Sequence, residues 1–171
     1  MLRTLLDRHR DLRAEADRIA LELLEDIRTD DIATRVERAV RGLDPDRLAE
    51  RSGRKRWGYV EPGEAAYEIL EEVVAPFLAE MNRLIALRLE QPAVATCAGI
   101  ALGLYAVRDS TDDGVLAYAS DFPAETAGYV VATLARESAR KHRTRWTLPK
   151  SFIERVPDWE AMLFHIGRAG R

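Results

Sequence analysis

The chain has 171 residues, of which 47% are hydrophobic and 32% are charged, and its formal net charge is −3. This composition is that of an ordinary folded protein, and the negative net charge argues against a surface that binds nucleic acid all over. Its single cysteine, Cys97, excludes a disulfide within the chain and fits a reducing compartment, so a cytoplasmic location is expected.

The first 27 residues predict one long amphipathic helix. Leucine and isoleucine recur at helical spacing from Leu2 to Ile27, and the charged start lacks the apolar centre of a signal peptide. The apolar stripe resembles a coiled-coil seam, but His9 and Ala16 weaken it. We therefore expect this helix to pack on the rest of the chain, and homo-oligomer formation through it is the alternative.

Two further helices are expected before the first irregular segment, over residues 30–41 and 44–50. Residues 51–61 break the helical pattern, and no stretch of the chain alternates over enough residues to predict a strand. Pro62 then opens a long helix to Leu89, with a kink or an interruption expected at Pro76.

The stretch from Gln91 to Val107 carries no charged side chain. An uncharged helix rich in small residues needs neighbours on most of its sides, so the sequence predicts a buried helix at about residues 92–108. Gly99 and Gly103, four residues apart, would let a neighbouring helix approach closely. The run is shorter than the roughly 20 apolar residues of a membrane-spanning helix, so no membrane association is expected.

Polar residues from Asp109 to Gly114 form a loop, and helices are expected over residues 115–119, 124–142 and 157–166. The predicted fold class is therefore all-α. It is a helical bundle, or a short solenoid-like array of antiparallel helix hairpins, around the central apolar helix. We expect a single all-helical domain over residues 1–171, and the alternative is that residues 1–50 form a semi-independent helical layer.

The sequence contains no motif typical of catalysis, of a metal centre or of a cofactor site. The three histidines lie far apart, and no glycine-rich phosphate loop or nucleophile elbow occurs. Cys97 is expected to behave as a small apolar residue. Four glutamates on the 62–89 helix are interpreted as a solvated face near the helix start: Glu64, Glu68, Glu71 and Glu72. No catalytic residue, metal or cofactor is predicted, and enzyme activity is not favoured.

Two segments combine dense positive charge with aromatic residues. The first candidate binding residues are Arg54, Lys55, Arg56, Trp57 and Tyr59, and the second are Arg140, Lys141, Arg143, Arg145 and Trp146. Arginine and aromatic side chains dominate protein interfaces, and they also contact phosphates and stack on bases. Four basic residues within Arg51–Arg56 predict an exposed recognition loop, whose surface the second segment would complete.

The sequence therefore favours a non-catalytic α-helical protein-interaction module, as a subunit or fragment of a larger assembly with an unidentified protein partner. The alternative is a nucleic-acid-associated helical protein that uses residues 51–59 and 136–146. A third interpretation is purely structural: the aromatics anchor loops on the core and the arginines pair with acidic residues.

Overall fold

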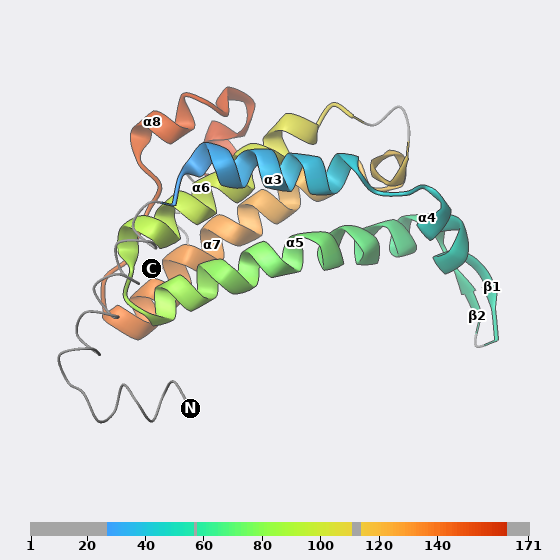
Figure 1. Ribbon diagram of the computed structural model, residues 1–171, viewed down its shortest axis with the longest axis horizontal. Helices are drawn as coiled ribbons and strands as arrows, with labels where there is room; N and C mark the ends of the chain where they lie inside the picture. The colour runs from blue at the N-terminus through green and yellow to red at the C-terminus, as the bar shows by residue number, and fades with distance from the viewer. Residues whose placement is uncertain (1–26, 57, 111–113, 164–171) are drawn as a thin grey trace, which may run out of the picture.

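The computed structural model describes residues 27–56, 58–110 and 114–163 (Figure 1). Six α-helices are described there: α3 (Thr29–Arg41), α4 (Asp46–Arg51), α5 (Pro62–Ala86), α6 (Glu90–Val107), α7 (Phe122–His142) and α8 (Lys150–Ile153). Two 3-10 turns, η1 (Val115–Tyr118) and η2 (Pro157–Trp159), and two short strands, β1 (Gly53–Lys55) and β2 (Gly58–Val60), complete these elements. The predicted all-α fold class is confirmed as a helical bundle.

Helix α6 lies at the centre of the bundle, with α3, α5 and α7 packed around it (Figure 1). Its side chains are apolar on every side, so it buries nearly its whole circumference, and Cys97, Ile100 and Leu104 are completely inaccessible to solvent. The prediction of a buried apolar helix is confirmed. Among the described residues, no helix combines the length and the apolar character that crossing a bilayer requires.

The glycines of α6 are the points at which α3 comes closest. A Cβ added at Gly99 would lie 2.5 Å from the Cβ of Ile32, and one at Gly103 would lie 2.6 Å from the carbonyl oxygen of Ala33 and from the Cβ of Val36. The two helices therefore touch through backbone and Cβ atoms, and there is no room for a side chain at either glycine. The predicted close approach is confirmed, with α3 as the neighbouring helix.

Helix α5 is continuous through Pro76, so the interruption considered there does not occur. The helix ends at Ala86, three residues earlier than predicted. Arg88 adopts a left-handed conformation with φ of 63°, while the backbone N–H groups of Arg88 and Leu89 donate to the carbonyls of Ile85 and Leu84. These two bonds form a Schellman motif, which satisfies the last carbonyls of α5 and turns the chain directly into α6.

Strands β1 and β2 pair antiparallel as a β-hairpin, so the prediction that the chain contains no strand is wrong. The register pairs Gly53 with Val60, Arg54 with Tyr59, and Lys55 with Gly58. Gly53 and Gly58 have φ values of 85° and 152°, which side chains disfavour. Strands of three residues are too short for an alternating pattern, and this is why the sequence did not reveal them.

Several predictions fall partly or wholly outside the described residues. The N-terminal helix over residues 2–27 and its coiled-coil seam lie there, as does the end of the helix expected over residues 157–166. The division of the chain into one domain, or into a domain and a separate layer over residues 1–50, stays a prediction.

Candidate interaction surface

The β-hairpin formed by residues 53–60 extends from the end of the bundle where α4 meets the start of α5 (Figure 1). Glu72 of α5 fixes its base. The carboxylate accepts two hydrogen bonds from Arg51, at 2.7 and 2.8 Å, and one from Arg47 at 3.2 Å. The hydrogen bond from Arg51 holds the pKa of Glu72 below the usual glutamate range. Arg51 is therefore part of the support of the hairpin and is not one of its free charges.

The tip of the hairpin carries positive charge that the described part of the chain does not neutralise. Arg54 and Arg56 are exposed, and neither guanidinium forms an ion pair or a hydrogen bond with a described residue. Lys55 is half-buried, and its Nζ donates to the backbone carbonyl of Glu50. Tyr59, the cross-strand partner of Arg54, is 63% exposed, so a guanidinium and a phenol project on one face. The predicted Trp57 lies outside the described residues.

Acidic side chains begin directly beyond the hairpin. Glu61, Glu64 and Glu68 are exposed at the start of α5. The negative charges of Glu61 and Glu64 suit the positive end of the helix dipole. The positive patch is therefore confined to the hairpin and borders a negative surface.

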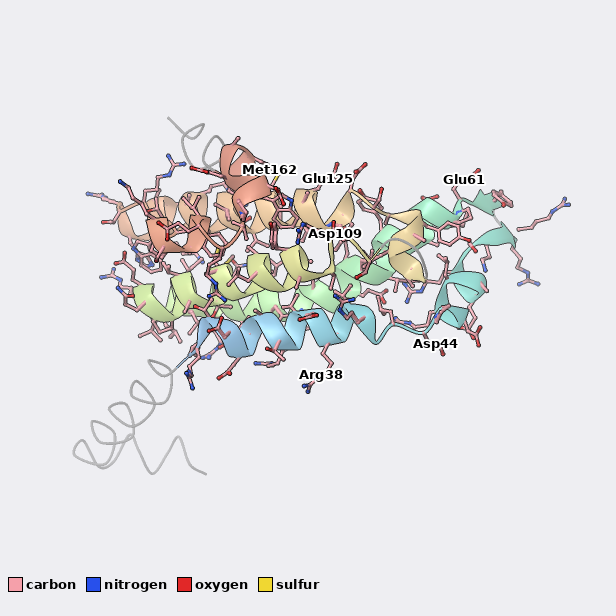
Figure 2. The ribbon with its side chains drawn as sticks, turned by 90° about the horizontal axis from the view of Figure 1, so that it is seen from above. Arg38, Asp44, Glu61, Asp109, Glu125 and Met162 are labelled. Carbon is pink, nitrogen blue, oxygen red and sulfur yellow. The ribbon has the colours of Figure 1, made fainter. Side chains whose placement is uncertain are left out.

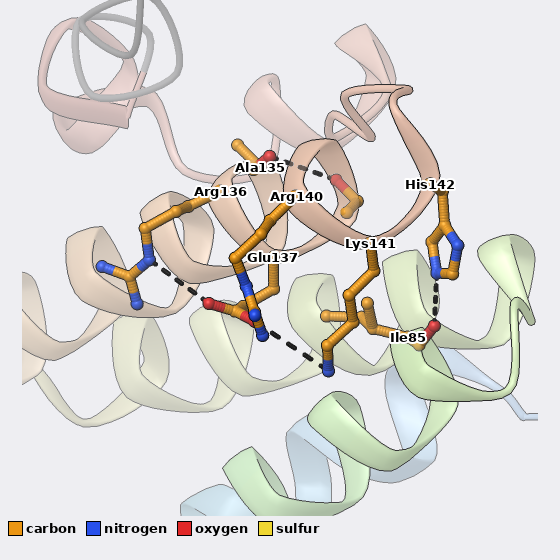
Figure 3. A network of polar contacts seen from close by, with 8 residues as sticks. Ile85, Ala135, Arg136, Glu137, Arg140, Lys141 and His142 are labelled. Atoms are coloured by element: carbon orange, nitrogen blue, oxygen red, sulfur yellow. Dashed lines mark hydrogen bonds and ion pairs between the residues drawn. The ribbon is translucent and has the colours of Figure 1, made fainter.

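In the second basic segment, residues 136–146, three cations share one carboxylate. Glu137 lies 2.7 Å from Arg140, 3.5 Å from Arg136 and 3.9 Å from Lys141 (Figure 3). The hydrogen bond from Arg140, aided by the other cations, lowers the pKa of Glu137. Three basic side chains of this segment therefore form ion pairs within α7, and the single carboxylate offsets one of their charges.

The aromatic residue of the second segment belongs to the core. Trp146 is only 4% exposed, and its ring stacks on His142 with the centroids 5.1 Å apart. Its backbone N–H donates to Ser138 Oγ at 2.9 Å, and His142 Nε2 lies 2.6 Å from the Ile85 carbonyl oxygen (Figure 3). As a correction to the sequence interpretation, Trp146 cannot stack on a partner, because it anchors the chain after α7.

The two remaining arginines of that segment behave differently from each other. Arg143 is exposed and has a left-handed conformation at the end of α7, with φ of 58°. Arg145 is half-buried, and its Nε is enclosed without a hydrogen-bond partner among the described residues. Of these two arginines, Arg143 is therefore the exposed one.

The two segments lie at opposite ends of α5. The hairpin leads into Pro62, whereas His142 contacts Ile85 at the other end of this 25-residue helix. At a rise of about 1.5 Å per residue, Pro62 and Ile85 are about 35 Å apart along the helix axis. The second segment therefore does not complete the surface of the hairpin, and that expectation is wrong.

The pKa directions predict how stability depends on pH. Hydrogen bonds from Arg51, Arg83 and Arg140 lower the pKa values of Glu72, Glu80 and Glu137, respectively. A carboxylate with a lowered pKa stabilises the fold above its unfolded pKa of about 4.3 and loses that effect as the pH falls through its folded value. We expect the thermal midpoint to fall below about pH 4.3. Glu137→Gln should make that decline shallower in circular dichroism melts, and an unchanged decline would contradict the role of this pair.

The described residues give no support to a metal site or to a reactive cysteine. They contain no cluster of histidine, cysteine, aspartate and glutamate side chains that could hold a metal ion. Cys97 is fully buried, and this burial raises the pKa of its thiol, which disfavours the reactive thiolate.

Comparisons with known proteins identify no relative. The chain matches no protein-family model, no curated protein and no solved structure.

Proposed function

We propose that the chain is a protein-interaction module whose recognition element is the β-hairpin of residues 53–60, and that its partner presents an acidic surface. The observation that carries this proposal is the pair of exposed guanidiniums of Arg54 and Arg56, which lack an anionic partner among the described residues. Tyr59 beside them supplies the aromatic surface that is common in interface hot spots.

The acidic surroundings favour a protein partner over a nucleic acid. An extended phosphate backbone lying on the hairpin would meet the carboxylates of Glu61, Glu64 and Glu68 at the start of α5. Since the other basic segment lies at the far end of α5, that segment does not continue the contact. A compact acidic site on a protein could pair with Arg54 and Arg56 without approaching those glutamates.

Replacement of the two free arginines tests the proposal. Arg54→Ser/Arg56→Ser keeps Lys55, which bonds to Glu50, and should leave the thermal midpoint unchanged. The variant should nevertheless fail to recover the partner from extracts of the cells that make the protein. Arg88→Ser/Arg143→Ser is the matched control, because these two arginines are exposed at the opposite end of α5 and α7 and should keep full recovery.

Two results would contradict the proposal. Undiminished recovery by Arg54→Ser/Arg56→Ser would show that the hairpin does not bind, and a lowered thermal midpoint would show that its arginines are structural. Nuclease treatment separates the alternative: recovery that nuclease abolishes, with a steep linear dependence on the logarithm of salt concentration, would indicate nucleic acid.

A further inference from the structure

An apolar groove with acidic edges runs between α5 and α7, next to the hairpin. Its volume is about 430 Å³. Val74 and Phe122 are buried beneath it, and Tyr129 stands at its side with 55% of its surface exposed. Glu71 and Glu125 are its charged lining residues, and none of the residues that line it is basic.

Tyr67 fixes the shape of the groove where it approaches the hairpin. The ring of Tyr67 meets that of Phe122 edge to face, with the centroids 5.5 Å apart. The phenol donates a hydrogen bond of 3.0 Å to Glu125, and burial together with this bond raises the pKa of Tyr67. The aromatic pair therefore ties α5 to α7 and holds one acidic edge in place.

The other acidic edge carries charge that its own helix leaves unbalanced. Glu64, Glu68 and Glu71 follow one another at spacings of four and three residues, so they share one face of α5, and all are exposed. Like charges at these spacings repel each other and destabilise a helix. Neither Glu64 nor Glu71 forms an ion pair with a described residue, so a cation from outside would relieve the repulsion.

The hairpin and the groove are neighbouring parts of one surface. Tyr67 lies five residues after Pro62, which is about 7.5 Å along the helix axis. Figure 2 shows Glu61, at the foot of the hairpin, and Glu125, at the edge of the groove, along the same side of the molecule. A patch that carries unpaired cations at one end and unpaired anions beside them is complementary to itself under a two-fold rotation.

We infer that the acidic partner of the hairpin is a second copy of this chain, whose α5–α7 groove receives Arg54, Arg56 and Tyr59. Under a two-fold axis, each copy supplies one hairpin and one groove. The arginines then reach the edge formed by Glu64 and Glu71, and Tyr59 meets the apolar side of the groove near Tyr129. This inference rests on the proposed function of the hairpin and specifies its partner.

The association state of the purified full chain tests the inference. Sedimentation equilibrium at low salt should give a concentration-dependent dimer. At about 1 M NaCl, where the Debye length is about 3 Å, the mass should return to that of the monomer. Arg54→Glu/Arg56→Glu and Glu64→Arg/Glu71→Arg should each lower the association constant at least about tenfold, because hairpin and groove then carry the same charge.

Mixing the two charge-reversed variants gives the decisive result. In the mixed pair each reversed hairpin meets a reversed groove and each native hairpin meets a native groove, so a heterodimer should form although neither variant self-associates. The matched controls Arg88→Glu/Arg143→Glu and Asp31→Arg/Glu154→Arg reverse exposed charges away from this surface and should dimerise normally. Circular dichroism spectra of all four variants should match that of the native chain.

A native chain that is monomeric at low salt over the whole concentration range would overturn the inference, and so would two charge-reversed variants that remain dimers. A charge-reversed variant that loses its helical spectrum is replaced by the neutral pairs Arg54→Gln/Arg56→Gln and Glu64→Gln/Glu71→Gln, which should weaken the dimer in the same direction. If the chain is monomeric but Arg54→Ser/Arg56→Ser still loses its cellular partner, this inference fails and the proposed function stands.

Discussion

Gly103→Leu should lower the free energy of unfolding by about 1–3 kcal/mol or more, because the contact between α3 and α6 has no space for a side chain. A Cβ at position 103 already lies 2.6 Å from both the Ala33 carbonyl oxygen and the Val36 Cβ. The backbone of α3 would have to move, since neither obstacle is the end of a flexible side chain. Chemical denaturation monitored by circular dichroism measures the change.

Gly103→Ala tests the same contact, and the sign of its effect on the free energy of unfolding gives the answer. On an exposed helix surface this substitution stabilises by roughly 1 kcal/mol through helix propensity. Here it should destabilise, because even a methyl group overlaps α3. Ala106→Leu, at an exposed position of the same helix, is the control and should change stability by less than about 0.5 kcal/mol. Unchanged midpoints for both Gly103 variants would show that α3 does not pack against this glycine.

Trp146→Ala should lower the free energy of unfolding by about 3–5 kcal/mol, the usual effect of removing a large aromatic side chain from a core. The ring is 4% exposed and stacks on His142, which in turn contacts the Ile85 carbonyl. The variant therefore leaves a cavity beside α7 and frees the chain that follows it. Denaturant titration gives the magnitude.

Tyr59→Ala is the matched aromatic control for Trp146→Ala. Since Tyr59 is 63% exposed, its removal should change stability by less than about 0.5 kcal/mol while partner recovery falls. A Trp146→Ala variant as stable as the native chain would contradict the assignment of Trp146 to the core. It would restore the sequence interpretation in which this tryptophan faces a partner.

The helical architecture was predictable because the helices are long, and because both their apolar patterns and the residues at their ends indicate them. The uncharged run from Gln91 to Val107 requires neighbours all around it, and it became the central helix. Pro62 marked the start of α5 correctly, since proline fits the first turn of a helix. The end of α5 was missed because Arg88 takes a left-handed conformation that glycine usually adopts.

The candidate binding residues were predictable in type but not in arrangement. The two basic segments have similar compositions, so the sequence did not distinguish them. Only the tertiary contacts show that Arg54 is exposed and Trp146 is buried. Glu137 forms ion pairs with Arg140 and Lys141 at spacings of three and four residues, so these pairs could have been anticipated from the sequence. The α5–α7 groove joins residues more than forty positions apart, and no local pattern reports such a juxtaposition.

The central claim is that the hairpin is the surface that contacts the partner. Site-specific photo-cross-linking tests this claim most directly. A photoreactive amino acid is placed at position 56, at the tip of the hairpin, or at position 143, at the exposed end of α7. Irradiation in the cell extract should produce a covalent adduct with the recovered partner from position 56 and none from position 143. Adducts from position 143 alone, or with equal yield from both positions, would contradict the account.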